Sequence, residues 1–139
     1  MRYNSTRVTD AHLATLAGFR YALRKFLSFS EQAAASAGLR PQHYLALLAI
    51  HGHPDKDRVT RGVRAERMQV RPNSAVGLAD RLARRGLVLR RRSAKDARQV
   101  RLVLTARGER MLRQVAGLNR AELTRLKDEI IRLLRKLGH

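Results

Sequence analysis

Leucines recur at helical spacing near the N-terminus of the chain, at Leu13, Leu16, Leu23 and Leu27. We expect Asp10 to cap this first helix and the helix to fade near Gly38. Pro41 suits the first position of a second helix, because the N–H that proline lacks would be unused there. Gly52 should end that helix, and its predicted face consists of Tyr44, Leu47, Leu48 and His51.

The next segment, HGHPDKDRV at 51–59, is polar and rich in turn residues, which predicts a loop. Thr60 can cap a third helix that ends near Gln69. Pro72 opens a fourth helix, and Gly86 should end it as a left-handed cap. Its apolar residues follow the i, i+3, i+4, i+7 pattern of an amphipathic helix, at Ala75, Leu78, Ala79 and Leu82.

Two runs, 87–92 and 100–105, then predict the strands of a hairpin, the second with apolar residues at Val100, Leu102 and Leu104. Thr105 should cap another helix that extends to about Leu118. A last helix carries a heptad-like seam that we expect to pack on the first helix and on a second copy of the chain: Leu123, Leu126, Ile130, Leu133 and Leu137. The pattern predicts a mainly α fold with a small β-wing.

Composition limits the possible classes of protein. The 139 residues suit a single domain, 1–139, with a modest core. The chain has no cysteine, which excludes disulfides and cysteine-based metal sites. The longest apolar run, Tyr44 to Ile50, is far too short to cross a bilayer, and no signal peptide is recognisable. We therefore expect a cytoplasmic protein without membrane contact.

The formal net charge is +19, and its excess lies in the middle of the chain. Residues 51–108 carry 16 basic and 5 acidic side chains. A solvated surface tuned for solubility is one interpretation. However, solubility does not require charge to be concentrated in one segment, so the distribution favours a polyanionic partner.

The order of elements is helix, short turn (MQVRP at 68–72), helix and basic hairpin, which is the form of a helix-turn-helix with a wing. The major groove of duplex DNA admits one helix, so the polar start of the fourth helix could reach base edges. The predicted base-contacting residues are Asn73, Ser74, Gly77 and Arg81, and we expect Arg84 and Arg85 to contact phosphates.

The hairpin carries a dense set of cations that would neutralise phosphates, namely Arg90, Arg91, Arg92 and Lys95. Arg98, near its tip, could enter the adjacent minor groove, where the negative potential is high. Asp96 would repel a phosphate. Two roles remain open for it: an ion pair that holds Arg98 in a productive rotamer, or the start of a turn.

Several segments together resemble the MarR family of winged helix-turn-helix regulators: RPNSAVGLADRLARRGLV at 71–88, DAR at 96–98 and VRLVLTARG at 100–108, with a weaker match in LRPQHYLALLAI at 39–50. In that family a recognition helix ending in D-R-L…R-G-L-V runs into a wing with D-x-R at its tip. An L-T-x-x-G helix start closes the wing. The spacing agrees without a gap.

The resemblance implies a homodimer whose two winged lobes, residues 39–108, bind a pseudo-palindromic operator in double-stranded DNA. The N- and C-terminal helices, 10–37 and 109–138, would interlock for dimerisation. Arg98 would take the minor-groove role and Asp96 the supporting one. We therefore expect a sequence-specific transcriptional regulator, acting as a repressor. The alternative is a nonspecific architectural nucleic-acid binder that uses charge alone.

The family often binds small, commonly phenolic effectors where the dimer helices meet the lobe. Four residues could line such a pocket for an aromatic effector, although packing in the core or interface is the competing interpretation: His12, Tyr21, His43 and Tyr44. The chain departs from the family at Gly77, where many members have arginine. It also departs at Arg61 and Arg64, where members usually place apolar residues on the inward face of the third helix.

The 51–58 loop contains four potential metal ligands: His51, His53, Asp55 and Asp57. Without a helical H-x-x-x-H or a cysteine pair, a polar loop is the simpler interpretation, and we predict no metal. No Ser/His/Asp grouping or glycine-rich phosphate loop is visible. We therefore predict that the protein is not an enzyme and has no cofactor.

Overall fold

The computed structural model describes residues 7–53, 72–92, 98 and 100–138, with residues 72–76 described by their backbone alone. The elements within these ranges are α1 (Asp10–Ser36), α2 (Pro41–His51), α4 (Pro72–Arg84), β1 (Val88–Arg92), β2 (Val100–Leu104) and α5 (Ala106–Arg135). The fold is therefore mainly helical with a small wing, as predicted. The predicted third helix, with Arg61 and Arg64, lies outside the described residues.

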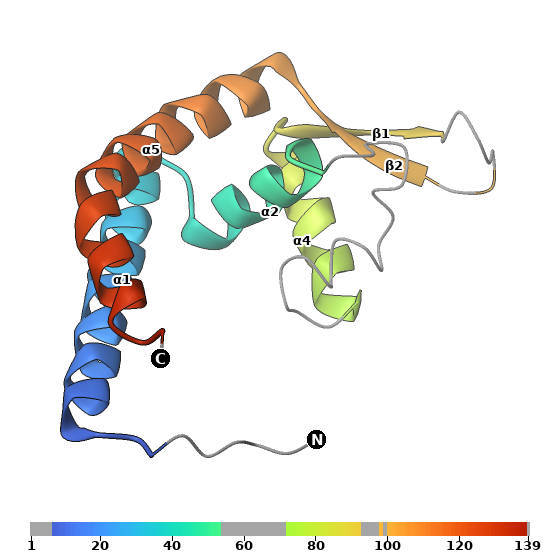
Figure 1. Ribbon diagram of the computed structural model, residues 1–139. Coiled ribbons are helices and arrows are strands. Elements are labelled where there is room, and N and C mark those ends of the chain that lie inside the picture. Colours follow the sequence, from blue (N-terminus) through green and yellow to red (C-terminus); the bar gives the residue numbers. More distant parts are fainter. Residues whose placement is uncertain (1–6, 54–71, 93–97, 99, 139) are drawn as a thin grey trace.

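The helices form two groups (Figure 1). The second half of α5 turns back along α1, so that these two long helices run antiparallel and side by side. The second group contains α2, α4 and the hairpin of β1 and β2, which projects away from the α1–α5 pair. Among the described residues, no helix combines the length and the apolarity needed to cross a membrane.

The first helix begins one residue earlier than predicted, because Thr9 rather than Asp10 is its N-cap. The Thr9 side-chain oxygen accepts a hydrogen bond from the His12 backbone N–H at 3.1 Å, and His12 Nδ1 accepts one from the Thr9 N–H at 3.2 Å. This reciprocal capping box satisfies two groups that the helix leaves unpaired. The prediction that Asp10 caps the helix was wrong. Asp10 lies in the first turn, where its negative charge interacts favourably with the helix dipole.

Two helices end in the same way, each with a glycine in the left-handed region. Gly38 after α1 has φ 74°, and Gly86 after α4 has φ 71°. In both cases the N–H of the residue after the glycine donates a hydrogen bond back to the last turns of the helix. The Leu39 N–H donates to the Ala34 carbonyl at 2.9 Å, and the Leu87 N–H donates to the Leu82 carbonyl at 3.0 Å. These are Schellman motifs, in which a glycine adopts the positive φ without steric cost. The predicted cap at Gly86 is confirmed.

The two strands pair antiparallel, with Val88 opposite Leu104, Arg90 opposite Leu102 and Arg92 opposite Val100. Val88 and Leu102 are buried, whereas Val100 is half exposed. The hairpin therefore packs against the helices only at its base, and its outer part stands in solvent.

The C-terminal part of the chain forms one helix, so the prediction of two helices separated after Leu118 was wrong. Thr105 caps the start of α5 as predicted, and its side chain accepts a hydrogen bond from the Gly108 N–H at 3.0 Å. The helix continues past Leu118 because residues 119–122 include no proline or glycine. The Asn119 amide also donates to the Val115 carbonyl one turn back, at 3.1 Å.

One core joins the end of α1, α2, α4, the base of the wing and the first half of α5. Its largest fully buried side chains are Leu39, Leu47, Leu82, Leu87, Val88 and Val115. The predicted face of α4 is confirmed for Leu78, Ala79 and Leu82. Leu48, predicted on the inward face of α2, is instead 42% exposed. Leu123, in the seam expected to pack on the first helix and on a second copy, is 43% exposed in the single chain.

The close approach of α5 to Leu87, the residue before β1, predicts a marked loss of stability at one glycine. A Cβ added to Gly108 would stand 2.1 Å from the Leu87 carbonyl oxygen, so the helix or the backbone at Leu87 would have to shift. We expect Gly108→Ala to lower the free energy of unfolding by about 1–3 kcal/mol in urea titrations followed by circular dichroism.

The control is Gly117→Ala in the same helix, where an added Cβ would have no atom within 4 Å. That change should leave stability unchanged or raise it by about 0.5–1 kcal/mol, because alanine favours helix. Equal stabilities of the two variants would contradict the close approach of Gly108 to Leu87.

Candidate nucleic-acid interface

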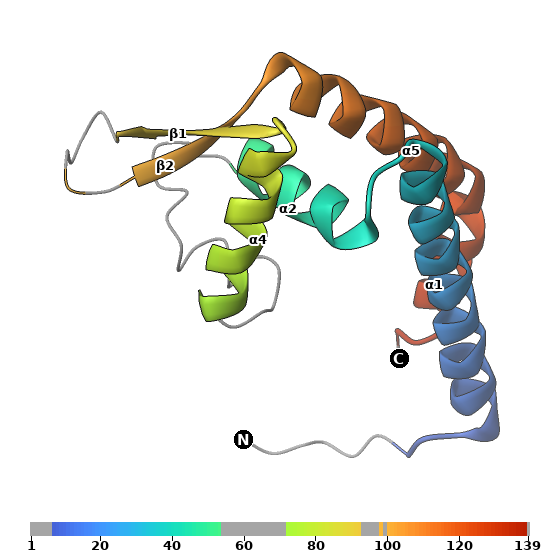
Figure 2. The ribbon, with the colours of Figure 1, turned by 180° about the vertical axis from the view of Figure 1, so that it is seen from behind.

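Helix α4 presents a basic face opposite the core. Leu78, Ala79 and Leu82 are buried, whereas Arg81 and Arg84 are exposed. Asn73 and Ser74 follow Pro72 in the first turn of the helix, where the structure describes the backbone alone. The first turn therefore lies at the free end of α4, away from the base of the wing (Figure 2).

Gly77 is half-buried and adjoins the guanidinium group of Arg81. A Cβ built at Gly77 would lie 3.4 Å from Arg81 Nη1. The absence of a side chain at this position thus leaves room for the Arg81 side chain to lie back along the helix.

Strand β1 of the wing carries three consecutive exposed arginines. Arg90, Arg91 and Arg92 are all exposed, and Arg98 is exposed near the tip. Arg90 forms an ion pair with Asp80 on α4, which links the wing to the helix. Lys95 and Asp96 lie outside the described residues, so both roles considered for Asp96 stay predictions.

Arg85 has partners within the protein, although the sequence pattern predicted a phosphate contact for it. Its Nη2 donates to the Gly38 carbonyl at 2.9 Å, and its Nη1 lies 3.2 Å from His43 Nδ1. The guanidinium group thus joins the ends of α1 and α4 to the start of α2. No local pattern could have indicated this contact, because Arg85 and His43 are 42 residues apart.

His43 is 4% exposed and lies at the wall of a hollow of about 440 Å³. Burial lowers the pKa of the His43 imidazole, and the positive charges of Arg85, Arg40 and Arg81 lower it further. The remaining lining comes from Gly38 and Arg84. A neutral histidine therefore sits among four arginines, Arg40, Arg81, Arg84 and Arg85.

Of the four predicted effector-pocket residues, only His43 lines this hollow. The structure therefore does not bring the four together around it. Tyr44 is buried, which raises the pKa of its hydroxyl, and the neighbouring Asn119 side chain opposes that rise. Tyr21 is 64% exposed on α1, and its ring lies 4.8 Å from Lys25 Nζ. His12 belongs to the capping box of α1.

The histidines of the 51–58 loop do not gather with other metal ligands in the part of the chain that the structure describes, where no group of three such side chains occurs. His51 Nε2 instead lies 3.8 Å from the Glu109 carboxylate, which also binds Arg113 at 2.9 Å. Asp55 and Asp57 lie outside the described residues.

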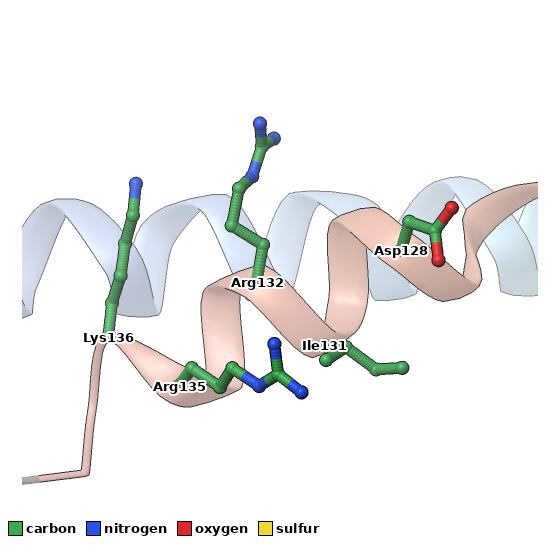
Figure 3. A pocket seen from close by; sticks show the side chains of 5 residues that line it. All are labelled: Asp128, Ile131, Arg132, Arg135 and Lys136. Carbon is green, nitrogen blue, oxygen red and sulfur yellow. The ribbon is translucent and has the colours of Figure 1, made fainter.

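The α1–α5 pair exposes many large apolar side chains, more than a surface in contact only with water usually carries. Large hydrophobic residues between 37% and 54% exposed occur on both helices: Leu13, Leu16, Leu23 and Leu27 on α1, and Leu118, Leu123, Ile131 and Leu134 on α5. Near the end of α5, a hollow of about 480 Å³ is lined by Asp128, Ile131, Arg132, Arg135 and Lys136 (Figure 3). Such a mixed surface is typical of a contact between proteins.

Residues 37–99 match the model of the MarR family. The comparison with curated proteins finds no match. Among solved structures, the chain is similar to CouR from Rhodococcus jostii RHA1 bound to p-coumaroyl-CoA, with 25% identity and a TM-score of 0.67 over 94% of this chain and 91% of CouR.

Two further solved structures share the fold. The YusO protein from Bacillus subtilis is 22% identical, with a TM-score of 0.63 over 91% of this chain and 93% of YusO. The S. aureus MepR–DNA complex is 19% identical, with a TM-score of 0.65 over 88% of this chain and 85% of MepR.

The environment of His43 predicts a pH dependence of stability. Its pKa in the folded protein lies below the ordinary value of 6.5, so the unfolded chain binds this proton more readily. The stability that a neutral His43 contributes is present above about pH 6.5 and is lost as the pH falls toward the folded pKa. Urea titrations at about pH 7.5 and 5.5 should show a larger loss for the wild type than for His43→Gln. An equal loss in both proteins would show that His43 carries no shifted pKa.

Proposed function

We propose that this chain, whose residues 37–99 match the MarR family model, is a DNA-binding transcription regulator of that family and acts as a sequence-specific repressor on a pseudo-palindromic operator. The observation that carries the proposal is the position of α4 beside an arginine-rich hairpin that projects away from the α1–α5 pair (Figure 2). The proposal includes no enzymatic activity, in keeping with a family of transcription regulators.

In this proposal the first turn of α4 enters the major groove. Asn73 and Ser74 contact base edges there, and Arg81 contacts a base edge or the adjacent backbone. Phosphate contacts come from Arg84 on α4 and from the wing: Arg90, Arg91, Arg92 and Lys95. The ion pair between Asp80 and Arg90 supports this arrangement, because it sets the wing at a defined position beside the helix. Arg98 enters the neighbouring minor groove.

The exposed leucines of α1 and α5 support a homodimer, because a second copy would cover them. In this arrangement residues 10–37 and 109–138 dimerise, and residues 39–108 form one DNA-binding lobe of each protomer. Two lobes related by two-fold symmetry read two half-sites, which accounts for a pseudo-palindromic operator.

A small aromatic effector would act by changing the spacing of the two lobes, and therefore their fit to successive half-sites. The solved structure of CouR contains p-coumaroyl-CoA, which supports a response to a small molecule. His12 and Tyr21 on α1 are the predicted lining residues with access to such a ligand at a dimer junction, because Tyr44 is buried.

A second candidate function is nonspecific architectural binding, which the net charge of +19 favours. Selection of bound duplexes from a random pool separates the two functions. We expect a palindrome to be enriched. Arg98→Ala should then weaken binding to that palindrome by about 1–3 kcal/mol in fluorescence-anisotropy titrations at fixed salt, with the dimer intact. A pool without enrichment would indicate nonspecific binding.

The matched control is Arg110→Ala, an exposed arginine in the first turns of α5. It removes the same charge, so it should reduce DNA affinity only through the weaker long-range attraction. If both variants lose the same affinity, the wing has no specific role in the complex.

The dimer is tested by placing a charge on α1. Leu16 is 47% exposed and would be buried by a second copy, so Leu16→Glu should weaken dimerisation roughly 100-fold in sedimentation-velocity experiments. Leu89→Glu is the control, because Leu89 is 49% exposed on the wing, away from α1. If Leu16→Glu remains a dimer at the protein concentrations at which the wild type is a dimer, this face is not the interface.

A further inference from the structure

The basic hollow beside His43 is distinct from the first turn of α4 and from the outer part of the wing. It lies between the C-terminal end of α4 and the start of α2, and it has a volume of about 440 Å³. Small-molecule sites typically have about 300–1,000 Å³. The hollow is therefore large enough for a small molecule and not only for a single ion.

Arginine side chains dominate its lining without a compensating carboxylate among the described residues. Within those residues, none of Arg40, Arg81 and Arg84 has an acidic partner, and the nearby Asp80 is paired with Arg90 instead. Like charges that converge without a counter-charge repel one another. An anion in the hollow relieves that repulsion and gains attraction from each of them.

The inner wall of the hollow is held in place by hydrogen bonds. Because arginine only donates, His43 Nδ1 accepts from Arg85 Nη1 at 3.2 Å, and Arg85 Nη2 donates to the Gly38 carbonyl at 2.9 Å. Arg85 is thus oriented before any ligand arrives. Arg40, at the N-cap of α2, is exposed and has no acidic partner among the described residues, so its guanidinium group is available to a ligand.

We propose that this hollow binds the phosphate group of a small phosphorylated molecule. Guanidinium groups match phosphate oxygens with paired hydrogen bonds, and a dianion gains roughly twice the Coulomb attraction of a carboxylate from the same arginines. The remaining volume takes the rest of the molecule. The regulatory consequence rests on the proposed function: a bound phosphate neutralises Arg81 and Arg84 near the DNA surface and so weakens DNA binding.

The first experiment needs no DNA. Inorganic pyrophosphate is titrated into the full-length protein by calorimetry at fixed ionic strength. We expect saturable binding of one anion per chain, which Arg40→Gln weakens roughly tenfold, the value of one charge-assisted contact. Arg120→Gln removes the same charge from an exposed position on α5 and should change the affinity less than about twofold.

Two results would overturn the proposal. Binding that does not saturate, or an equal loss in Arg40→Gln and Arg120→Gln, would mean that the anion is attracted by the net charge alone. Circular dichroism and thermal unfolding verify that both variants are folded. Because Arg40 is exposed and its side chain makes no capping bond, its replacement should leave the fold unchanged.

Proton uptake gives a second measurement that is specific to this hollow. An anion beside His43 stabilises the imidazolium, whose Nδ1 then no longer accepts from Arg85 Nη1. The anion also offsets the charges of Arg40, Arg81 and Arg85, which face His43 from the start of α2 and the end of α4. Pyrophosphate itself exchanges protons near pH 6.5, so the heats in buffers of different ionisation enthalpy are compared between the wild type and His43→Gln. On binding, the wild type should take up more protons than His43→Gln. Equal proton exchange in the two proteins would put the anion elsewhere and overturn the proposal.

A final titration with the selected DNA separates this site from a DNA phosphate contact. Pyrophosphate should weaken DNA binding more than potassium chloride at matched ionic strength, and Arg40→Gln should reduce that difference. The proposal is overturned if pyrophosphate does not bind saturably while Arg40→Gln weakens DNA binding more than Arg120→Gln does. In that case the hollow binds a phosphate of the DNA backbone and not a small molecule. If no DNA preference is found at all, the proposed function fails while the pyrophosphate titration still decides this proposal.

Discussion

The geometry of the interface depends on the backbone around Leu87, where α4, the wing and α5 meet. The Leu87 N–H bonds back to the Leu82 carbonyl, and the Leu87 carbonyl accepts from the Thr105 N–H at 3.0 Å. The Thr105 hydroxyl donates to the Gly86 carbonyl at 2.6 Å, and Gly108 packs directly against Leu87. Three elements are therefore joined within a few ångströms, so the wing cannot turn relative to α4 without disrupting the start of α5.

This junction explains how a small protein holds so many cations on one side. Leucine and alanine form the core behind α4, and the arginines occupy positions that the amphipathic pattern leaves outside. Two of the arginines are held within the protein: Arg90 by Asp80, and Arg85 by His43 and the Gly38 carbonyl. Arg81 and Arg84 have no acidic partner among the described residues, so their charge is available to an anion outside the protein. Arg85 therefore positions the structure, Arg81 and Arg84 are available for binding, and Arg90, whose ion pair with Asp80 lies at the surface, can do both.

The two groups of helices have different packing, which fits their proposed roles. The lobe has a continuous core from the end of α1 to the first half of α5. Along the outer part of the α1–α5 pair, buried residues such as Ala22 and Leu126 are few, and leucines on both helices stand exposed. In the proposed dimer, a lobe with its own core and an arm covered by a second copy would allow the lobes to move as units. Such movement is what regulation through lobe spacing requires.

The sequence by itself determined the local features, because their physical causes lie within a few residues. Pro41 begins α2, Gly86 ends α4 in the left-handed region, and Thr105 caps α5, each as predicted. A competing local signal explains one error, since Thr9 and Asp10 are both good caps; the other was the division of α5 after Leu118. Only the tertiary structure decided which arginines are held internally and that His43 faces a basic hollow. Those facts depend on contacts between residues far apart in the chain, and hydrophobic periodicity carries no information about them.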